Sequence, residues 1–173
     1  MTINGGSTCL SKTPGSALYD FNQLVYLSAG NFVLKANEGK VVATFNGDYK
    51  QNGGVFYLHS NIITPTSDSI EVIVKGSFNL MNGVINFDDH LSGSNKSLIR
   101  IRGNEFIVKG NSLITRAGSG TGAIFGTIRY ETSGILSYKR SGSSGMDQIK
   151  QLVGGSCIMM IDEGVFVLSS HNT

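Results

Sequence analysis

The stretch Val72–Phe87 reads VIVKGSFNLMNGVINF, two short apolar runs that are each interrupted by a glycine. A loose copy, ATFNGDYKQNGGVFYL, stands upstream at Ala43–Leu58. The copies align at a sequence offset of 29, which pairs Gly47 with Gly76 (76 − 47) and Gly54 with Gly83 (83 − 54). Apolar residues then coincide at alternate positions, the period of a strand with one buried face. The coinciding pairs are Ala43 with Val72, Phe45 with Val74, Tyr49 with Phe78, Phe56 with Ile85, and Leu58 with Phe87.

A strand-containing repeat of this length indicates a solenoid. One copy cannot bury its apolar face alone, whereas stacked copies pair their strands and close a continuous core. The glycines suit corners that need a positive φ or a close backbone approach. We therefore predict an all-β fold, a parallel β-helix (solenoid) with coils of about 24–29 residues. The general rule for parallel crossovers favours a right-handed coil.

Stacking of like residues predicts two columns in the core. The first is expected to contain Phe32, Phe56, Ile85 and Phe166, and the second Leu34, Leu58, Phe87 and Leu168.

A third copy at Ile99–Gly110 is weaker. It aligns Gly103 with Gly76 and Gly110 with Gly83 at an offset of 27 (103 − 76, 110 − 83). That register places Glu105 opposite Phe78, so a one-residue slip or bulge is needed to bring Phe106 there.

A longer echo relates the two ends of the chain. Ile149–Val153 repeats Phe21–Val25 at an offset of 128 (149 − 21), and Glu163–Leu168 repeats Ala29–Leu34 at an offset of 134 (163 − 29). The match is short. It is either chance or the sign of one unit in an array, or of a segment of a long surface protein.

The expected domain organisation is simple. Residues 1–17, rich in Ser, Thr and Gly, form a loose N-terminal segment or an incomplete coil, and residues 18–173 form a single solenoid domain. The Gly-rich segment 118–126 is predicted to be a corner of small residues. Residues 145–153 form one or two helical turns or, as the echo of Phe21 favours, a strand.

The composition limits the classes of function. Charged residues are 15% and the net charge is +2, which argues against nucleic acid or an anionic membrane as a partner. The longest apolar run near the end, Cys157–Ile161, is too short to span a membrane. Cys9 and Cys157 lie near opposite ends of a solenoid, and there is no Cys/His cluster of the kind that binds zinc. We expect no metal and no cofactor.

The glycine-bounded coils resemble those of large secreted proteins of the Bacteroidetes, which carry the pattern G-D-F-x-x-x-x-G. Val74–Phe87 and Phe45–Phe56 carry the resemblance, with Gly47-Asp48-Tyr49 as the match, and Gly118–Gly126 is more loosely similar. The likeness covers roughly residues 20–170. Such proteins are often exported by the type IX system and serve as cell-surface, adhesin-like or filamentous proteins, which implies an extracellular structural role. This chain shows no export signal and no C-terminal sorting domain, as expected of an internal segment or a processed subunit.

Parallel β-helices also include enzymes that act on carbohydrates, so catalytic residues need to be considered. Glycoside hydrolysis requires two carboxylates at a set separation. The best local candidate is Asp88-Asp89-His90, which reads more simply as a solvated corner before a Gly/Ser loop. Arg100 and Arg102 share one face of a strand and would suit an acidic glycan, or are simply its solvated face. No nucleophile motif surrounds any histidine. We predict that the chain is not an enzyme.

The two ends of the predicted solenoid look uncapped. The first apolar segment contains Leu24, Tyr26 and Phe32, and the last contains Met159, Met160 and Phe166. Neither carries the Pro or Lys residues that discourage edge pairing. We expect these ends to be covered by another copy, a partner chain or the rest of a longer polypeptide, and a glycan or surface ligand is a further candidate partner.

The sequence therefore favours a non-enzymatic extracellular structural or adhesive module, part of a cell-surface protein or filament. The alternatives are a carbohydrate-active β-helix enzyme, either a polysaccharide lyase or a glycosidase, and a glycan-binding module without catalysis.

Overall fold

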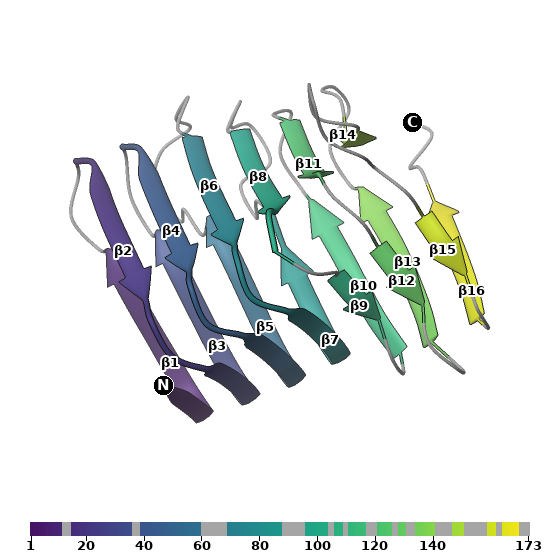
Figure 1. Ribbon diagram of the computed structural model, residues 1–173, viewed down its shortest axis with the longest axis horizontal. Coiled ribbons are helices and arrows are strands. Elements are labelled where there is room, and N and C mark those ends of the chain that lie inside the picture. The colour runs from purple at the N-terminus through teal and green to yellow at the C-terminus, as the bar shows by residue number, and fades with distance from the viewer. Residues whose placement is uncertain are drawn as a thin grey trace.

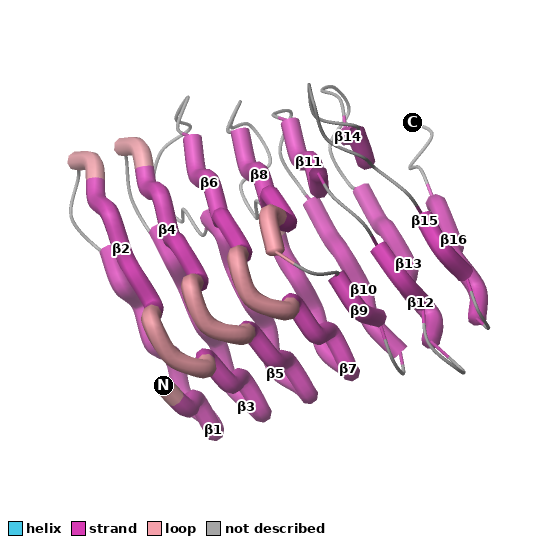
Figure 2. Tube along the Cα trace, viewed as in Figure 1, coloured by secondary structure: helices cyan, strands magenta, loops and turns pink. Residues whose placement is uncertain are grey.

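The fold is a parallel β-solenoid, seen in a computed structural model of the chain (Figure 1). The structure describes residues 1–11, 15–35, 39–59, 69–87, 96–103, 106–108, 111–116, 121–125, 128–130, 134–140, 147–150, 159–161 and 164–169. Within these ranges the regular elements are strands, joined by short corners, and there is no helix (Figure 2). Accordingly, no helix in the described part is long and apolar enough to cross a membrane.

Two parallel sheets form the walls. The ten-stranded sheet has a main path of β1 (Thr2–Ser11), β3 (Val25–Lys35), β5 (Tyr49–His59), β7 (Phe78–Asn86), β10 (Asn111–Arg116), β13 (Gly134–Arg140) and β16 (Gly164–Ser169). From β7 a branch continues through β9 (Phe106–Val108), β12 (Ile128–Tyr130) and β15 (Met159–Ile161). The six-stranded sheet runs β2 (Ala17–Phe21), β4 (Val41–Phe45), β6 (Ser69–Val74), β8 (Lys96–Ile101), β11 (Thr121–Phe125) and β14 (Asp147–Lys150).

The register confirms the repeat on which the prediction rests. Ala43 lies opposite Val72 and Phe45 opposite Val74 in one sheet. Tyr49 lies opposite Phe78 and Phe56 opposite Ile85 in the other. Each of these pairs has the sequence offset expected from the two copies, which is 29 (72 − 43, 78 − 49).

Coil lengths in the six-stranded sheet fall within the expected range. Counted between paired residues, they are 24 from β2 to β4 (41 − 17), 29 from β4 to β6 (70 − 41) and 27 from β6 to β8 (97 − 70). The next two are 25 (122 − 97) and 25 (147 − 122). The branch of the other sheet is less even, with a coil length of 22 from β9 to β12 (128 − 106) and 31 from β12 to β15 (159 − 128).

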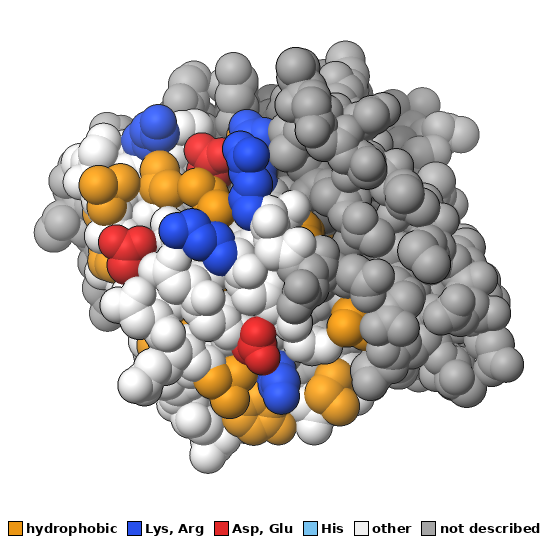
Figure 3. Space-filling view, in the orientation of Figure 1, with side chains coloured by type: hydrophobic (Ala, Val, Ile, Leu, Met, Phe, Trp, Pro, Cys, Tyr) orange, Lys and Arg blue, Asp and Glu red, His pale blue; other side chains and the backbone are white. Residues whose placement is uncertain are grey.

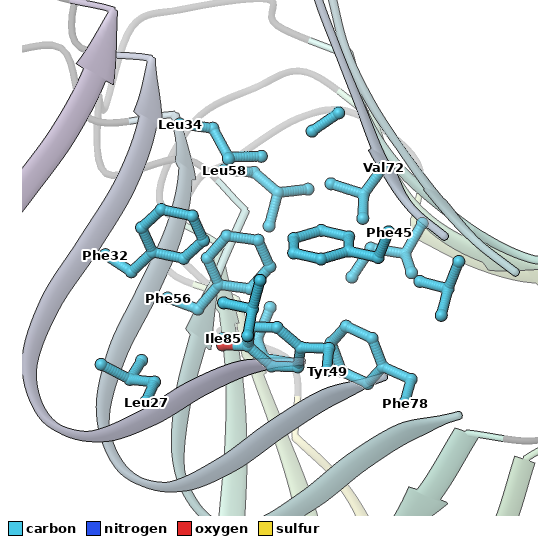
Figure 4. Packing of buried hydrophobic residues seen from close by; sticks show 14 of the residues in the cluster. Leu27, Phe32, Leu34, Phe45, Tyr49, Phe56, Leu58, Val72, Phe78 and Ile85 are labelled. Carbon is cyan, nitrogen blue, oxygen red and sulfur yellow. The ribbon is translucent and has the colours of Figure 1, made fainter. Parts of the chain in front are cut away.

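The core lies between the two sheets, where aromatic rings from successive coils stack on one another (Figure 4). The Phe32 and Phe56 rings are 5.2 Å apart and nearly parallel, at 13°. The Tyr49 and Phe78 rings are 4.5 Å apart at 20°. Each side chain is fully buried, and burial of one such side chain contributes about 1.5–3 kcal/mol.

The predicted columns are correct at their start and wrong at their end. Phe32, Phe56 and Ile85 are consecutive partners, and the ladder continues to Ile114, Tyr138 and Leu168. Leu168 thus takes the place expected for Phe166, whose partner is Leu136. Coils of unequal length cause this displacement.

The long echo is displaced for the same reason. Ile149 reaches Tyr19, and not Phe21, when its partners are followed through the six-stranded sheet.

The third copy contains the slip that the sequence required. Ile101 lies opposite Val74, an offset of 27 (101 − 74), whereas Phe106 lies opposite Phe78, an offset of 28 (106 − 78). The predicted pairing of Gly110 with Gly83 is wrong, because Gly83 lies opposite Ser112. Further residues inserted before β10 raise the offset to 29 (112 − 83).

Three segments for which the sequence did not predict a strand with certainty form strands in the structure. Residues 2–11 form β1, a strand of the main sheet, so this part of residues 1–17 is not loose. The Gly-rich segment expected to be a corner contains strand β11 at Thr121–Phe125. Residues 147–150 form strand β14, the alternative that the sequence favoured over helical turns.

Candidate functional site

The N-terminal end of the stack is formed by β1 and β2 (Figure 1). In the described part of the chain β1 pairs only with β3, and β2 only with β4. Alternate backbone N–H and C=O groups of a strand point to opposite sides, so half of those in β1 face away from β3. Such an edge is a template for pairing with another strand.

The β1 edge has few features that discourage pairing. Its sequence, TINGGSTCLS, contains no charged residue and no proline. At 10 residues it is nearly as long as its neighbour β3, which has 11. Natural edge strands are commonly short, charged or interrupted by proline. The edge of β1 is therefore long and uncharged, and its one irregularity is the register shift between Ile3 and Ser7.

Among the side chains whose burial the structure describes, the large exposed hydrophobic ones lie in or next to the same coil. The large hydrophobic residues that are exposed in the described part are Met1 at 43%, Leu18 at 79% and Leu24 at 43%. Leu10, Ala17, Tyr19 and Phe21 are only partly buried against the core. Phe21 stacks on Phe45 with ring centres 4.8 Å apart. Positions whose side chains are buried in later coils are therefore partly exposed to solvent in the first coil.

Figure 3 shows one face of the molecule, where acidic, basic and hydrophobic side chains are scattered among uncharged polar groups over the described part.

Glycine corners define how coils approach one another. A Cβ placed on Gly30 would lie 2.4 Å from the Gly6 carbonyl oxygen, and one on Gly54 would lie 2.4 Å from the Gly30 oxygen. Real Cβ atoms essentially never come that close to backbone atoms. Gly30 and Gly54 also have φ of 79° and 69°, a region that favours glycine. At these two corners the backbone therefore packs directly against the carbonyl groups of the preceding coil.

A second corner follows the same rule. A Cβ on Gly39 would lie 2.1 Å from the Gly15 oxygen. Gly15 is held in place by Lys35, a buried residue whose Nζ donates a hydrogen bond of 2.7 Å to the same oxygen.

Some of the predicted end residues lie elsewhere than expected. Phe32 is wrongly placed at the end, because β1 covers it and its exposure is 0%. Tyr26 lies opposite Thr2 in the second strand of the sheet and is half-buried. Leu24 is exposed beside the N-terminus, whose amino group donates to the Leu24 carbonyl at 2.8 Å. Met159 and Met160 lie in β15 and Phe166 in β16, the final strands of the branch and of the main path.

The candidate glycan-binding residues are only partly visible. Asp88, Asp89 and His90 lie outside the described residues. Arg100 points outward between the buried Ile99 and Ile101 and forms an ion pair with Glu71. The pair is partly buried at the surface. Surface ion pairs typically contribute about 0–1 kcal/mol. Arg102 is exposed just beyond the end of β8.

Metal-ligating side chains do not cluster in the described part of the chain. That part contains no group of three or more His, Cys, Asp and Glu side chains that could hold a metal ion. Cys9 is a half-buried reduced thiol in β1, and Cys157 lies outside the described part.

A buried polar network was not anticipated from the sequence. Gln51 is fully buried and occupies a ladder between Leu27 and Leu80. The Tyr49 hydroxyl donates to Gln51 Oε1 at 3.1 Å, and Gln51 Nε2 donates to the carbonyls of Gly54 and Val84 at 3.1 and 3.0 Å. The network lies where the pairing of β5 and β7 shifts register. The Gln51 amide thus donates hydrogen bonds to backbone carbonyl groups at the irregular part of the ladder.

Comparisons with known proteins do not assign the chain to a family. No family model, no curated protein and no solved structure matches the chain.

Proposed function

We propose that the chain is a non-enzymatic structural or adhesive module of an extracellular surface, part of a cell-surface protein or filament. The observation that carries the proposal is the edge of β1, which is long, uncharged and unpaired within the described part of the chain. A protein that acts alone in solution gains by blocking such an edge, because an open edge promotes association. A module that is built into a larger stack needs the edge open.

The composition supports the same reading. A surface in which Ser, Thr, Asn and Gly provide most of the polarity, with 15% charged residues, is common among extracellular surface proteins. The resemblance of the Gly47-Asp48-Tyr49 coil to secreted adhesin-like proteins points the same way.

Immunoelectron microscopy on intact cells of the source organism tests the proposal. Antibodies raised against the purified chain are expected to label the outside of unpermeabilised cells, on a layer or on filaments. Labelling that appears only after permeabilisation would contradict an extracellular role.

A panel of polysaccharides tests the enzymatic alternative. We expect the purified chain to release no oligosaccharide from any of them. Release by the wild type that is lost in Asp89→Asn and His90→Ala would replace the structural reading with a catalytic one.

A further inference from the structure

The corner at which the chain leaves the six-stranded sheet stacks equivalent positions of successive coils. The connections from β2, β4 and β6 to the other sheet lie side by side (Figure 2). One backbone hydrogen bond prolongs each strand pair into this corner, and its donors and acceptors are Asn46 to Phe21 at 2.9 Å, Lys75 to Phe45 at 2.8 Å, and Arg102 to Val74 at 2.7 Å. Asn22, Asn46, Lys75 and Arg102 therefore form one row, in which neighbours are about 4.8 Å apart.

The first half of this row is neutral and the second half is cationic. The side-chain amide of Asn46 donates a hydrogen bond of 2.9 Å to Asn22 Oδ1. Lys75 and Arg102 follow in the next two coils, and both are exposed. Arg100, two residues before Arg102, faces outward from β8. Three cations from two neighbouring coils thus share one corner.

The carboxylates near this corner do not neutralise the two exposed cations. Glu71 is paired with the outward arginine of β8. Asp48 Oδ1 accepts a hydrogen bond of 2.9 Å from the Ser77 backbone N–H. No carboxylate of the described part forms an ion pair with Lys75 or Arg102. Like charges that lie opposite each other on neighbouring strands are unfavourable, so the corner favours an anion that both cations can contact.

The mixture of cations and amides fits an acidic polysaccharide. Guanidinium and ammonium groups bind carboxylate or sulfate groups. The Asn22 and Asn46 amides retain donors and acceptors beyond their mutual hydrogen bond, and these can bind hydroxyl groups. A polysaccharide with acidic substituents supplies both kinds of group on one chain.

Single-stranded nucleic acid fits this corner less well. Proteins bind it through aromatic side chains on which the bases stack. No described residue of the corner connections is aromatic, and these residues are 22–24, 46–48, 75–77 and 102–103. The corner can therefore attract a polyanion but offers no platform for bases.

We propose that the row Asn22, Asn46, Lys75 and Arg102, with Arg100 beside it, binds an acidic polysaccharide that runs across the coils. Its acidic substituents contact Lys75 and Arg102, and its hydroxyl groups contact the two asparagines. Three steps between coils give the row a length of about 14 Å, which suits an extended oligosaccharide and not a single small anion. The inference rests on the proposed adhesive role and names the chemical class of the ligand.

Isothermal titration calorimetry of the full chain with four polymers tests the proposal: polygalacturonate, heparin, neutral dextran and a single-stranded oligodeoxynucleotide. The wild type is expected to bind polygalacturonate, heparin or both at low ionic strength, and to lose affinity as salt screens the charges. Binding of heparin alone would identify sulfate as the acidic group, and binding of polygalacturonate would identify carboxylate. Dextran and the oligonucleotide are expected to bind at least about tenfold more weakly.

Lys75→Gln and Arg102→Gln each remove one charge from an exposed side chain outside the strands. The double variant is expected to bind the acidic polysaccharide at least about tenfold more weakly than the wild type, a change of 1.4 kcal/mol. Lys40→Gln is the matched control, because Lys40 is exposed just before β4, at the other end of that strand from Asn46. It is expected to bind within about twofold of the wild type, since its charge lies beyond a screening length from the corner. Circular dichroism and thermal unfolding establish that each variant is folded.

A wild type that binds neither acidic polysaccharide would overturn the proposal, as would a folded double variant with unchanged affinity. An equal loss of affinity in Lys40→Gln would show a response to net charge and not a site. Equally tight binding of the oligonucleotide would show a preference for polyanions in general. These outcomes are distinct from the location of the protein, so surface labelling without polysaccharide binding would leave the structural role standing and remove this site.

Discussion

Phe78 shows how single residues stabilise a stack of coils. Its ring is fully buried, 4.5 Å from the ring of Tyr49 in the preceding coil and 4.8 Å from that of Phe106 in the next. One side chain therefore contacts both neighbouring coils. Loss of the ring would remove buried apolar surface and leave a cavity between the Tyr49 and Phe106 rings. Because each of those rings is held in its own coil, the cavity cannot close by the movement of one side chain alone.

We predict that Phe78→Ala lowers the free energy of unfolding by about 3–5 kcal/mol, the usual cost of removing a buried phenylalanine ring. Chemical denaturation with urea measures the loss. Asn79→Ala is the control, because Asn79 follows on the outward side of β7, and it is expected to stay within about 0.5 kcal/mol. Equal stability of Phe78→Ala and the wild type would disprove this register.

Tyr49 makes stability depend on alkaline pH. Burial raises the pKa of its hydroxyl well above the ordinary value of 10.0. Above that ordinary value the unfolded state loses its proton first, so the folded state holds more protons and stability falls as the pH rises. Below it both states are protonated and Tyr49 contributes no dependence on pH.

The expected result is a melting temperature that decreases between about pH 9.5 and pH 11.5 more steeply in the wild type than in Tyr49→Phe. Tyr49→Phe starts from a lower stability, because it removes the hydrogen bond to Gln51. The other tyrosines titrate in both proteins, so the difference between the two slopes reports on Tyr49. Parallel curves would show that Tyr49 ionises as easily in the folded state as in the unfolded state.

At the scale of the element, the corners fix how coils pack. Gly6 and Gly54 have nearly the same φ, 66° and 69°, but a Cβ on Gly54 would lie 2.4 Å from a backbone oxygen whereas one on Gly6 would meet no described atom. Alanine at either site carries the cost of a left-handed conformation, about 1–2 kcal/mol. Only alanine at Gly54 must also separate two coils.

Gly54→Ala should therefore destabilise the monomer more than Gly6→Ala, and the difference measures the coil-to-coil contact alone. Denaturant unfolding at a concentration too low for assembly gives both values. Identical losses would mean that the corner contact contributes nothing beyond the backbone conformation.

The strands with regular alternation could be predicted from the sequence, and the others could not. Phe45, Tyr49, Phe56 and their partners recur at a constant offset, so both strand type and register follow from periodicity. Strand β1 has one fully buried apolar residue, Ile3, and owes its pairing to β3, which no local pattern reveals. Register was lost after Gly103, since insertions at corners move later residues without leaving a periodic trace.

The candidate site, too, could be predicted from the sequence only in part. Apolar segments without Pro or Lys predict an uncapped end, but they place it at Phe32, one strand too far into the chain. The corner role of Gly6 and the buried Gln51 network depend on contacts between coils. Such contacts are not encoded in residue spacing within a single coil.

The whole molecule is a stack of parallel coils in one register. Neighbouring strands in a sheet are about 4.7–4.9 Å apart, which is within the Cα separation that a disulfide spans. Tyr57 and Asn86 are opposite each other on the outward side of β5 and β7. Val84 precedes Asn86 on the same side and lies opposite Val55.

Disulfide trapping between neighbouring coils tests the stacked register. In a Cys9→Ser/Cys157→Ser background, Tyr57→Cys/Asn86→Cys is expected to form an intramolecular disulfide under mild oxidation. Tyr57→Cys/Val84→Cys should stay reduced, because its cysteines are diagonal neighbours at about 7–8 Å. Mass spectrometry of the alkylated chain distinguishes the two states. Efficient bridging of the first pair alone is the predicted result, and bridging of the second pair in preference to the first would contradict the stacked register.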